Sequence, residues 1–380
     1  MGVPLIQQIA VGKYILKQRL KGNKRYPLVL MLEPLFQCNL ACAGCGKIDF
    51  PKPILQKRLS LEDCLKAVDE CGAPMVAIPG GEPLIHKEIG EIVKGITDRK
   101  KFVSLCTNAI LLEKKLHLFE PSDYLFFSVH LDGLEEEHDK AVCQDGVFTK
   151  AVKAIKAAKA AGFNVNVNAT IFDGTTAEQI AEYLDFTKEL GVGVTISPGF
   201  SYERAPEQEL FLNREKTKNL FRDVFSRGKG KKWSLNHSHL YLDFLAGNQS
   251  YECTPWGMPT RNIFGWQKPC YLIGEGYVDT FQELMETTDW ESYGTGNYEK
   301  CGDCMAHCGY EPTTVVDMVY HPIKALKVAL RGIKTKGPMA PEIDLSKQRA
   351  ANYNIHEEHV DKMMAQEAVS YTHLTLPTKA

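Results

Sequence analysis

Short apolar runs alternate with helix-like segments through the first half of the chain, and this alternation is the strongest constraint on its fold. The helix-like segments are rich in Ala, Lys, Glu and Leu, with apolar residues three and four positions apart. Strands separated by helices form parallel sheets, because each crossover returns the chain to the same end of the sheet. The expected strands are 28–32, 75–78, 102–106, 124–129, 163–171 and 192–196, and the expected helices are 61–71, 87–96, 148–161 and 178–190.

Capping residues support these boundaries. Ser60 with Asp63 three residues later, and Thr176, are typical of helix starts. Gly72 and Gly191 stand where helices should end. We therefore expect an α/β protein with a parallel sheet, and the pattern alone does not separate a barrel from an open sheet. In parallel α/β barrels the chemistry gathers at the carboxyl ends of the strands.

The pattern changes after about residue 203. A helical stretch extends to residue 225, a turn rich in Gly and Lys follows at 227–232, and the region beyond it holds all four tryptophans and many cysteines. We expect an N-terminal amphipathic helix (1–23), a core (24–203), a C-terminal cap that covers the substrate (204–345) and a helical or disordered tail (346–380). The last residues, 370–380, read as a disordered or non-native extension.

Composition argues against several classes of protein. The 380 residues are 44% hydrophobic and carry a formal net charge of −2, so the chain is globular and no nucleic-acid partner is expected. The N-terminus lacks the features of a signal peptide, so the twelve cysteines are expected to be reduced thiols in the cytoplasm. No apolar run approaches the roughly 18 residues that span a bilayer.

Three cysteines stand at a spacing typical of an iron-sulfur site. Cys38, Cys42 and Cys45 occur in the string CNLACAGCG after the first expected strand. Three thiolates can hold three irons of a [4Fe-4S] cluster and leave the fourth iron open to a substrate, whereas a cluster that only carries electrons normally has four cysteine ligands. A three-ligand zinc site and chance clustering are the alternatives.

Glycines and polar residues follow the other expected strands. Two adjacent glycines let the backbone approach a ligand closely, and Glu82 beside them can hold the loop. Turn formation and helix capping are equally good interpretations of Ser128 and Asp132. Asn168 alternates with two other asparagines along one face of its strand. The expected cofactor-binding residues are Gly80, Gly81, Glu82, Thr107, Asn108, Ser128, Asp132 and Asn168.

Cysteines outside the triad indicate two further roles. Cys106 lies at the end of the third expected strand, where its S–H bond could give a hydrogen atom to a carbon radical; a small buried apolar side chain is the alternative. A second cluster, CGDCMAHC, suits a structural zinc ion or an auxiliary iron-sulfur cluster, and spacing does not select the metal. Its cysteines are Cys301, Cys304 and Cys308, with Cys253 and Cys270 upstream.

Two segments have the pattern of helices that lie on a membrane surface. Segments 5–20 and 323–333 can be drawn as helices with Leu, Ile and Val on one side and Lys or Arg toward the other. Most such helices simply pack on their own domain. We therefore expect a cytoplasmic protein, with peripheral contact to the inner face of the cytoplasmic membrane as an open alternative.

The combined motifs resemble a known superfamily. The triad, Gly-Gly-Glu-Pro after the second strand and Thr-Asn after the third resemble the radical S-adenosylmethionine (SAM) enzymes, although Ala109 replaces the glycine that commonly follows Thr-Asn. This resemblance implies a partial (βα)6 barrel, a [4Fe-4S] cluster whose open iron binds SAM, and loop oxygens that bind the SAM ammonium group. The strings EPLFQCNLACAGCGKI, ISPGFSYERAPEQELFL and GWQKPCYL resemble, more narrowly, the hopanoid-biosynthesis radical SAM family of adenosylhopene transferases (adenosylhopane synthases).

The narrower resemblance implies a reaction. The 5'-deoxyadenosyl radical would add to the alkene of the triterpene diploptene, with SAM consumed and methionine released. The remaining tertiary radical needs a hydrogen atom, for which Cys106 is the candidate catalytic donor and solvent or an external reductant the alternative. Aromatic residues from Tyr202 to Trp266 would form apolar walls around a hydrophobic substrate. Flavodoxin or ferredoxin would donate the electron to the cluster. Competing hypotheses are a peptide- or cofactor-modifying radical SAM enzyme with an auxiliary cluster, and a non-catalytic iron-sulfur or zinc binding module.

Overall fold

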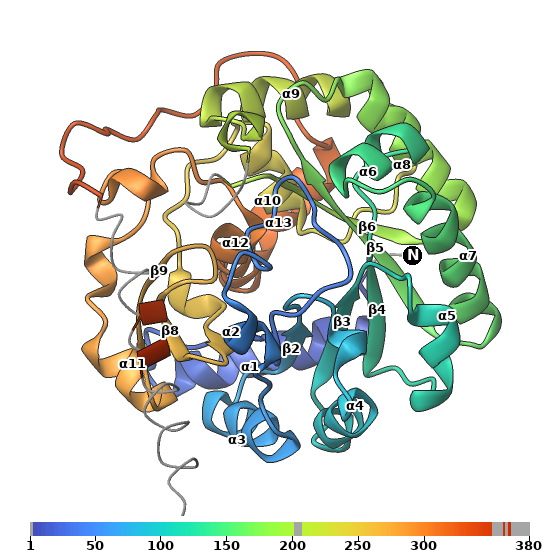
Figure 1. The fold of residues 1–380 in the computed structure, drawn as a ribbon. Helices are drawn as coiled ribbons and strands as arrows, with labels where there is room; N and C mark the ends of the chain where they lie inside the picture. Colours follow the sequence, from blue (N-terminus) through green and yellow to red (C-terminus); the bar gives the residue numbers. More distant parts are fainter. Residues whose placement is uncertain (1–2, 201–206, 352–359, 362–363, 366–380) are drawn as a thin grey trace, which may run out of the picture.

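The computed structural model describes residues 3–200, 207–351, 360–361 and 364–365. Within these residues nine strands form one sheet in the order β6-β5-β4-β3-β2-β1-β7-β8-β9. Strands β1 to β6 pair in parallel with their sequence neighbours, and the sheet curves into a barrel that does not close (Figure 1). The strands are β1 (Val29–Leu32), β2 (Met75–Ile78), β3 (Phe102–Thr107), β4 (Leu125–His130), β5 (Asn164–Ile171), β6 (Gly193–Pro198), β7 (Thr260–Asn262), β8 (Gly265–Pro269) and β9 (Gly274–Val278).

Helices cover the outer face of the parallel strands, as the alternating pattern predicts (Figure 1). The helices among the first six strands are α2 (Lys52–Gln56), α3 (Leu61–Cys71), α4 (Ile89–Asp98), α5 (Leu112–Lys115), α6 (Glu135–Ala141), α7 (Val147–Ala160) and α8 (Ala177–Leu190). The remaining helices are α1 (Leu5–Leu20), α9 (Arg214–Arg227), α10 (His239–Leu245), α11 (Phe281–Thr287), α12 (His307–Tyr320) and α13 (Pro322–Arg331).

The predicted caps are confirmed. Ser60 and Asp63 form a capping box at the start of α3, and Gly72 ends that helix in the left-handed conformation, with φ of 66°. Thr176 begins α8 with a second capping box, and Gly191 ends it with φ of 68°. These local signals explain why the helix boundaries could be predicted closely.

Strand β5 shows how the sheet separates its two faces. Its apolar residues, Val165 to Ile171 at alternate positions, are buried beneath the helices, whereas Asn164, Asn166 and Asn168 are half-buried on the inner face. The inner face of this strand is therefore polar, as its alternating asparagines predicted. This arrangement places Asn168 toward the interior of the barrel.

The C-terminal region, expected as a cap, also extends the core sheet. Strand β7 pairs in parallel with β1, matching Met31 with Thr260 and Leu32 with Arg261, and β8 and β9 add antiparallel strands. These strands are three to five residues long and have no clear alternation, so the sequence pattern missed them. The predicted domain boundaries at 23, 203 and 345 remain predictions.

Some expectations fall on residues that the structure does not describe. Tyr202 and the extension 370–380 lie outside the described residues, as does most of the predicted tail 346–380. Within the described part of the chain, each helix is too short or too polar to cross a bilayer.

Candidate active site

A cavity of about 790 Å³ opens at the carboxyl ends of the parallel strands, and we call it the large cavity. It joins the loop after β1 and the ends of β2 to β6 to side chains of the C-terminal region. Nine sequence-predicted residues and the predicted hydrogen donor line it together. They are Cys38, Cys42, Cys45, Gly80, Gly81, Thr107, Asn108, Asp132 and Asn168, with Cys106 as the donor.

The three predicted iron ligands lie on one loop. Cys38, Cys42 and Cys45 are half-buried, and the backbone N–H of Cys45 donates to the carbonyl of Cys42 at 3.1 Å. Burial raises the pKa of the Cys38 thiol to about 11 and also raises that of Cys42, so these thiols stay protonated unless a metal replaces the proton. Their all-sulfur donor set fits an iron-sulfur cluster.

The spacing of the triad side chains bears on which metal suits them. Within the described ranges, no three Cys, His, Asp or Glu side chains converge on a position that one metal ion could occupy. Thiolates at about 2.3 Å from one zinc ion must converge closely. A cube of several irons holds its thiolates farther apart than a single zinc ion does.

The glycine loop lies directly against the segment that leads into the triad. The N–H of Gly81 donates to the carbonyl of Leu35 at 3.0 Å. A Cβ added at Gly81 would lie 2.2 Å from the carbonyl oxygen of Gln37, and one added at Gly80 would lie 2.5 Å from that of Leu35. Only glycine fits at these positions, because the obstructing atoms belong to the backbone.

Glu82 lies behind the glycine loop. It is not among the described residues that line the large cavity. Its fully buried carboxylate accepts from the Thr107 hydroxyl and the Asn108 N–H, both at 2.9 Å, and from the Leu84 N–H at 3.0 Å. Burial raises the pKa of Glu82 to about 7, although these hydrogen bonds act against the rise. The geometry makes Glu82 a positioning residue that ties β2 to β3.

Asn108 reaches the triad. Its Nδ2 donates to Oδ1 of Asn39 at 2.8 Å and lies 3.8 Å from Sγ of Cys38. Ala109, which stands where the superfamily commonly has glycine, has φ of 64°. The loop therefore keeps the left-handed conformation that glycine favours, in spite of the substitution.

His130 and Asp132 form a pair at the end of β4. Nε2 of His130 donates to Oδ2 of Asp132 at 2.7 Å, and the Thr170 N–H donates to the other carboxylate oxygen at 2.8 Å. Burial lowers the pKa of His130, but the Asp132 charge outweighs it and the pKa is raised overall. Asp132 thus lines the large cavity and also ties β4 to β5.

Cys106 is half-buried and lines the large cavity. Its register partner on β4 is Ser128, which does not line the cavity but hydrogen-bonds the thiol. Burial raises the pKa of Cys106 to about 11, so the S–H bond persists at neutral pH.

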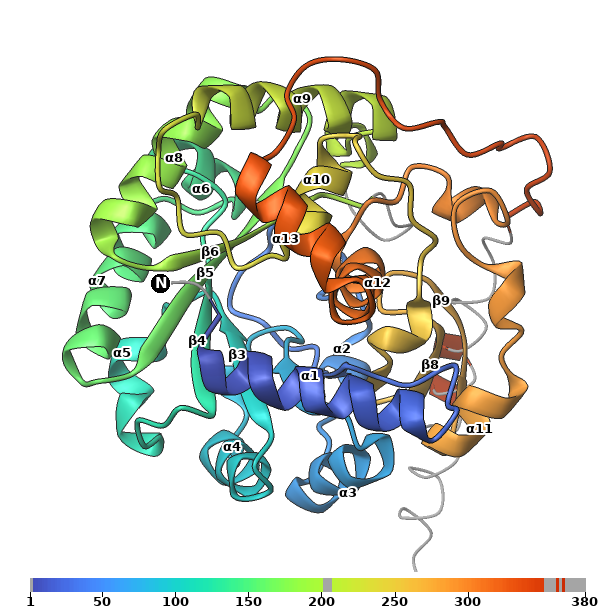
Figure 2. The same ribbon diagram turned by 180° about the vertical axis from the view of Figure 1, so that it is seen from behind.

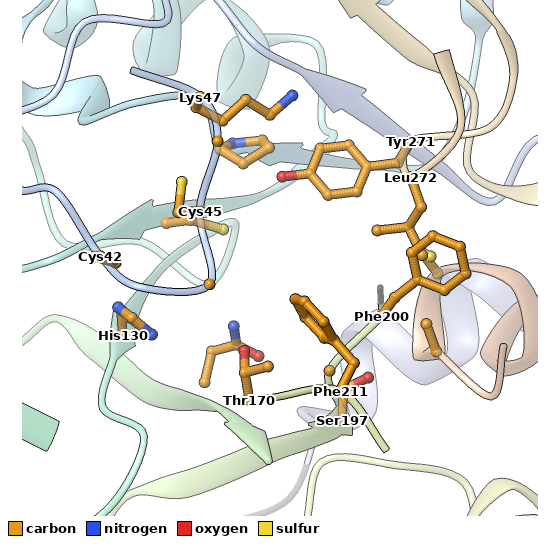
Figure 3. A pocket seen from close by; sticks show the side chains of 18 of the residues that line it. Cys42, Cys45, Lys47, His130, Thr170, Ser197, Phe200, Phe211, Tyr271 and Leu272 are labelled. Carbon is orange, nitrogen blue, oxygen red and sulfur yellow. The ribbon is translucent and has the colours of Figure 1, made fainter. Parts of the chain in front are cut away.

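Aromatic and aliphatic side chains form the wall opposite the triad. Figure 3 shows Phe200, Phe211, Tyr271 and Leu272 across the cavity from Cys42, Cys45 and His130. Further apolar residues of the lining are Phe36, Phe50, Phe172, Leu212, Ile273 and Tyr277.

Several lining residues were missed by sequence reasoning. Nζ of Lys47 lies 2.9 Å from a carboxylate oxygen of the buried Glu33 and over the Tyr271 ring. Nδ1 of the His307 imidazole has no hydrogen-bond partner among the residues that the structure describes. Burial lowers the pKa of His307 to about 4, so it is neutral at physiological pH. His130, the last residue of β4, could be placed at this edge of the sheet from the sequence, whereas Lys47 and His307 reach the cavity through packing between distant segments.

The comparisons with known proteins agree with this geometry. Residues 32–187 match the radical SAM superfamily, and residues 194–328 match a family described as "Domain of unknown function (DUF3463)". GTP 3',8-cyclase from Listeria monocytogenes is 27% identical over 165 residues, which cover 42% of this chain and 50% of that protein. GTP 3',8-cyclase 1 from Mycobacterium tuberculosis is 28% identical over 179 residues, 43% of this chain and 49% of that protein. The chain thus spans about half the length of these relatives.

Solved structures share the fold. SuiB from Streptococcus suis, bound to its precursor peptide SuiA, has a TM-score of 0.58 at 16% identity, over 77% of this chain and 73% of that chain. The enzyme anSMEcpe with bound AdoMet has a TM-score of 0.54 at 18% identity, over 81% of this chain and 96% of that chain. The chain therefore carries a radical SAM superfamily domain followed by a DUF3463 domain.

Proposed function

We propose that this radical SAM protein adds the 5'-deoxyadenosyl radical of SAM to the alkene of a hydrophobic triterpene such as diploptene. The observation that carries the proposal is the Cys106 thiol in the lining of a cavity with cysteines at one end and an apolar wall at the other. The sequence resemblance to the hopanoid-biosynthesis family points the same way.

The positions of the predicted cofactor residues around the large cavity support this proposal. Cys38, Cys42 and Cys45 would hold a [4Fe-4S] cluster, which when bound and reduced supplies the electron that cleaves SAM. The loop of Gly80 and Gly81 presents backbone atoms to the same cavity without side chains in the way. Thr107, Asn108, Asp132 and Asn168 add polar groups around it. Glu82 positions Thr107 and Asn108 from behind, and Ser128 hydrogen-bonds Cys106.

The lining favours an apolar substrate over a nucleotide triphosphate. Lys47 and Lys300 are its only Lys or Arg residues within the described part of the chain, and Asp132, Glu299 and Asp303 offset their charge. A triphosphate normally needs several cationic side chains. The matches to the GTP 3',8-cyclases cover only 42% and 43% of this chain, so we do not carry GTP over as the substrate.

Cys106 has the chemistry to end the reaction. Addition of the carbon radical to the alkene forms one C–C bond and leaves a radical on the substrate. Transfer of the Cys106 hydrogen forms a C–H bond and leaves a sulfur radical. One electron from an external reductant such as flavodoxin or ferredoxin and one proton from solvent would restore the thiol. Burial supports this role, because it keeps the sulfur protonated.

Two helices suit contact with a membrane that holds such a substrate. Eight of the ten exposed large hydrophobic side chains within the described residues lie on α1 and α13. On α1 they include Leu5, Ile9, Leu16 and Leu20, whose spacing places them on one side of the helix. Figure 2 shows α1 and α13 together on the side of the molecule that Figure 1 turns away.

A second candidate is modification of a peptide. The fold neighbours SuiB and anSMEcpe are described with bound peptides, and the C-terminal region of this chain gathers five cysteines. An auxiliary metal cluster next to the substrate would suit peptide modification as well as addition to a triterpene. We rank the triterpene above the peptide as the candidate substrate because of the apolar wall and the family resemblance.

Product analysis would test the proposal. Anaerobically reconstituted protein would be incubated with reductant, SAM and diploptene, and the extract analysed by mass spectrometry. We expect an adenosyl-triterpene adduct, which a Cys38→Ser/Cys42→Ser/Cys45→Ser variant should not form. Production of 5'-deoxyadenosine without adduct would reject the triterpene and retain the superfamily chemistry; adduct formation by the triad variant would reject the assigned cluster site.

A further inference from the structure

Gly44 lies on the loop that carries the three cysteines of the triad, which we call the triad loop (residues 38–45). Its φ angle is not in the left-handed region, so the backbone conformation does not require a glycine there. The space around it does. A Cβ added at Gly44 would lie 2.8 Å from two atoms of the Phe172 ring, Cε1 and Cζ. The Phe172 ring therefore occupies the volume that a side chain at residue 44 would fill.

The same ring reaches the apolar wall opposite the triad. Phe172 and Phe211 meet edge to face, with ring centroids 5.9 Å apart and ring planes at 62°. A Cβ added at Gly199 would lie 3.2 Å from two further atom contacts on the Phe172 ring, Cδ1 and Cε1. Gly44, Phe172, Gly199 and Phe211 all line the large cavity, and Figure 3 shows Phe211 on the wall that faces the cysteines. One ring thus connects the triad loop to the apolar wall.

The backbone on both sides of Phe172 is fixed. The carbonyl of Ile171, the last residue of β5, accepts from the Gly199 N–H at 2.8 Å. The N–H of Asp173 donates to the carbonyl of Leu210 at 2.7 Å. The residues before and after Phe172 are therefore held by hydrogen bonds to two other segments. These bonds hold the ring between the triad loop and the wall.

A phenylalanine ring in this place can exclude water. It has no polar atom, so it can neither ligate a metal nor move a proton. Water that reaches a radical or a reactive cluster causes side reactions, and a closed site prevents them. Solvent exposure is also one of the influences on the reduction potential of an iron-sulfur cluster. The ring lies where both effects would act on a cluster held by the triad.

We propose that Phe172 is a shielding residue that keeps water from the triad cluster on the side of the apolar wall, and that residue 44 is a glycine because it leaves room for this ring. The proposal rests on the assignment of the triad to a [4Fe-4S] cluster. It stands whether or not the triterpene is the substrate, because shielding the cluster does not depend on what else enters the large cavity.

A double-mutant comparison tests the shielding role. The unmodified chain, Gly44→Ala, Phe172→Ala and the double variant would be reconstituted anaerobically with iron and sulfide and then reduced. The electron paramagnetic resonance signal that changes on addition of SAM identifies the triad cluster. Two quantities would be measured for that signal, namely its rate of loss in the presence of a ferrous-iron chelator, bathophenanthroline disulfonate, and its midpoint potential.

Phe172→Ala should lose the signal on the order of fivefold faster than the unmodified chain, because the chelator and water reach the cluster. Its midpoint potential should become more positive, since water stabilises the additional negative charge of the reduced cluster. Gly44→Ala should act in the same direction, because its methyl group displaces the ring. The double variant should be no faster than Phe172→Ala, because the methyl group then has no ring to displace.

Phe225→Ala is the matched control. It removes a half-buried phenylalanine of α9 that is not among the described residues lining the large cavity, and it should change neither quantity. Circular dichroism checks that each variant folds, and Gly44→Ala decides the question if Phe172→Ala does not fold. An unchanged rate and potential in the folded variants, or effects of the two substitutions that add in full, would overturn the shielding role alone. Failure of the unmodified chain to assemble a SAM-responsive cluster would overturn the cluster assignment as well.

Discussion

Glu82 is a buried acid whose pKa, raised by burial to about 7, makes stability depend on pH. A carboxyl group with a folded pKa above its usual 4.5 stabilises the fold fully below pH 4.5, and that contribution is lost as pH rises through about 7. Relative to Glu82→Gln, which resembles the protonated acid, the unmodified chain should lose about 2 to 3 kcal/mol of unfolding free energy between pH 5 and 8.

Urea denaturation of both chains at several pH values would measure this difference. Asp98→Asn, on the exposed end of α4, is the matched control and should show almost no such trend. A parallel pH dependence of the Glu82→Gln variant and the unmodified chain would contradict the role assigned to burial.

Gly81 has no room for a side chain. Gly81→Ala places a methyl group against two backbone carbonyls, at 2.2 and 2.3 Å from the oxygens of Gln37 and Phe36, so the loop must shift. We expect a loss of about 2 kcal/mol in stability and at least tenfold weaker SAM binding by the reconstituted protein. Thermal unfolding and equilibrium binding would measure these effects. Gly12→Ala, which meets nothing within 4 Å, should change neither by much.

Cys106 can be tested by separating two products. In Cys106→Ala, formation of 5'-deoxyadenosine should continue, whereas the reduced adduct should fall at least tenfold, because the hydrogen donor is gone. Unmodified protein in deuterated buffer should yield an adduct with one additional deuterium, since thiol protons exchange. Cys143→Ala removes an exposed thiol and should leave both products unchanged. An unaltered adduct yield in Cys106→Ala would eliminate the donor role.

At the scale of elements, α1 and α13 carry apolar faces beside basic residues. Ile323, Leu326 and Leu330 lie on one side of α13, and Lys327 and Arg331 adjoin them. Anionic lipid should attract such a surface.

Vesicle flotation would test this expectation. The full chain should bind phosphatidylglycerol vesicles more than phosphatidylcholine vesicles, and Leu16→Ser/Leu20→Ser/Leu326→Ser/Leu330→Ser should reduce binding at least fivefold. Leu118→Ser/Leu345→Ser, which alters exposed leucines on other elements, is the control. If both variants float like the unmodified chain, the two helices do not form the contact.

At the scale of the whole molecule, β7 covers the edge of β1. A chain that ends at residue 200 would expose this edge, because β7 to β9 would be missing. We expect it to aggregate on size-exclusion chromatography, whereas a chain that ends at residue 351 keeps those strands and should elute as the full chain does. A monodisperse short chain would show that the first domain needs no such cover.

The sequence predicted the parts of the molecule that depend on local signals. The helices could be bounded by capping boxes such as Ser60 with Asp63, and the residues that directly follow strands could be placed at one end of the barrel. Strand β7 could not be predicted, because three residues carry no period and its partner is more than two hundred residues away. Lys47 and His307 reach the cavity only through packing between distant segments.

The pairing of β1 with β7 has a mechanical consequence. The first matched family ends at residue 187 and the second begins at residue 194, yet one continuous sheet runs through both, so backbone hydrogen bonds join the two walls of the large cavity. A hinge motion that separates the two walls would break backbone hydrogen bonds of that sheet. We therefore expect a substrate to enter the large cavity without a hinge motion between the two matched regions.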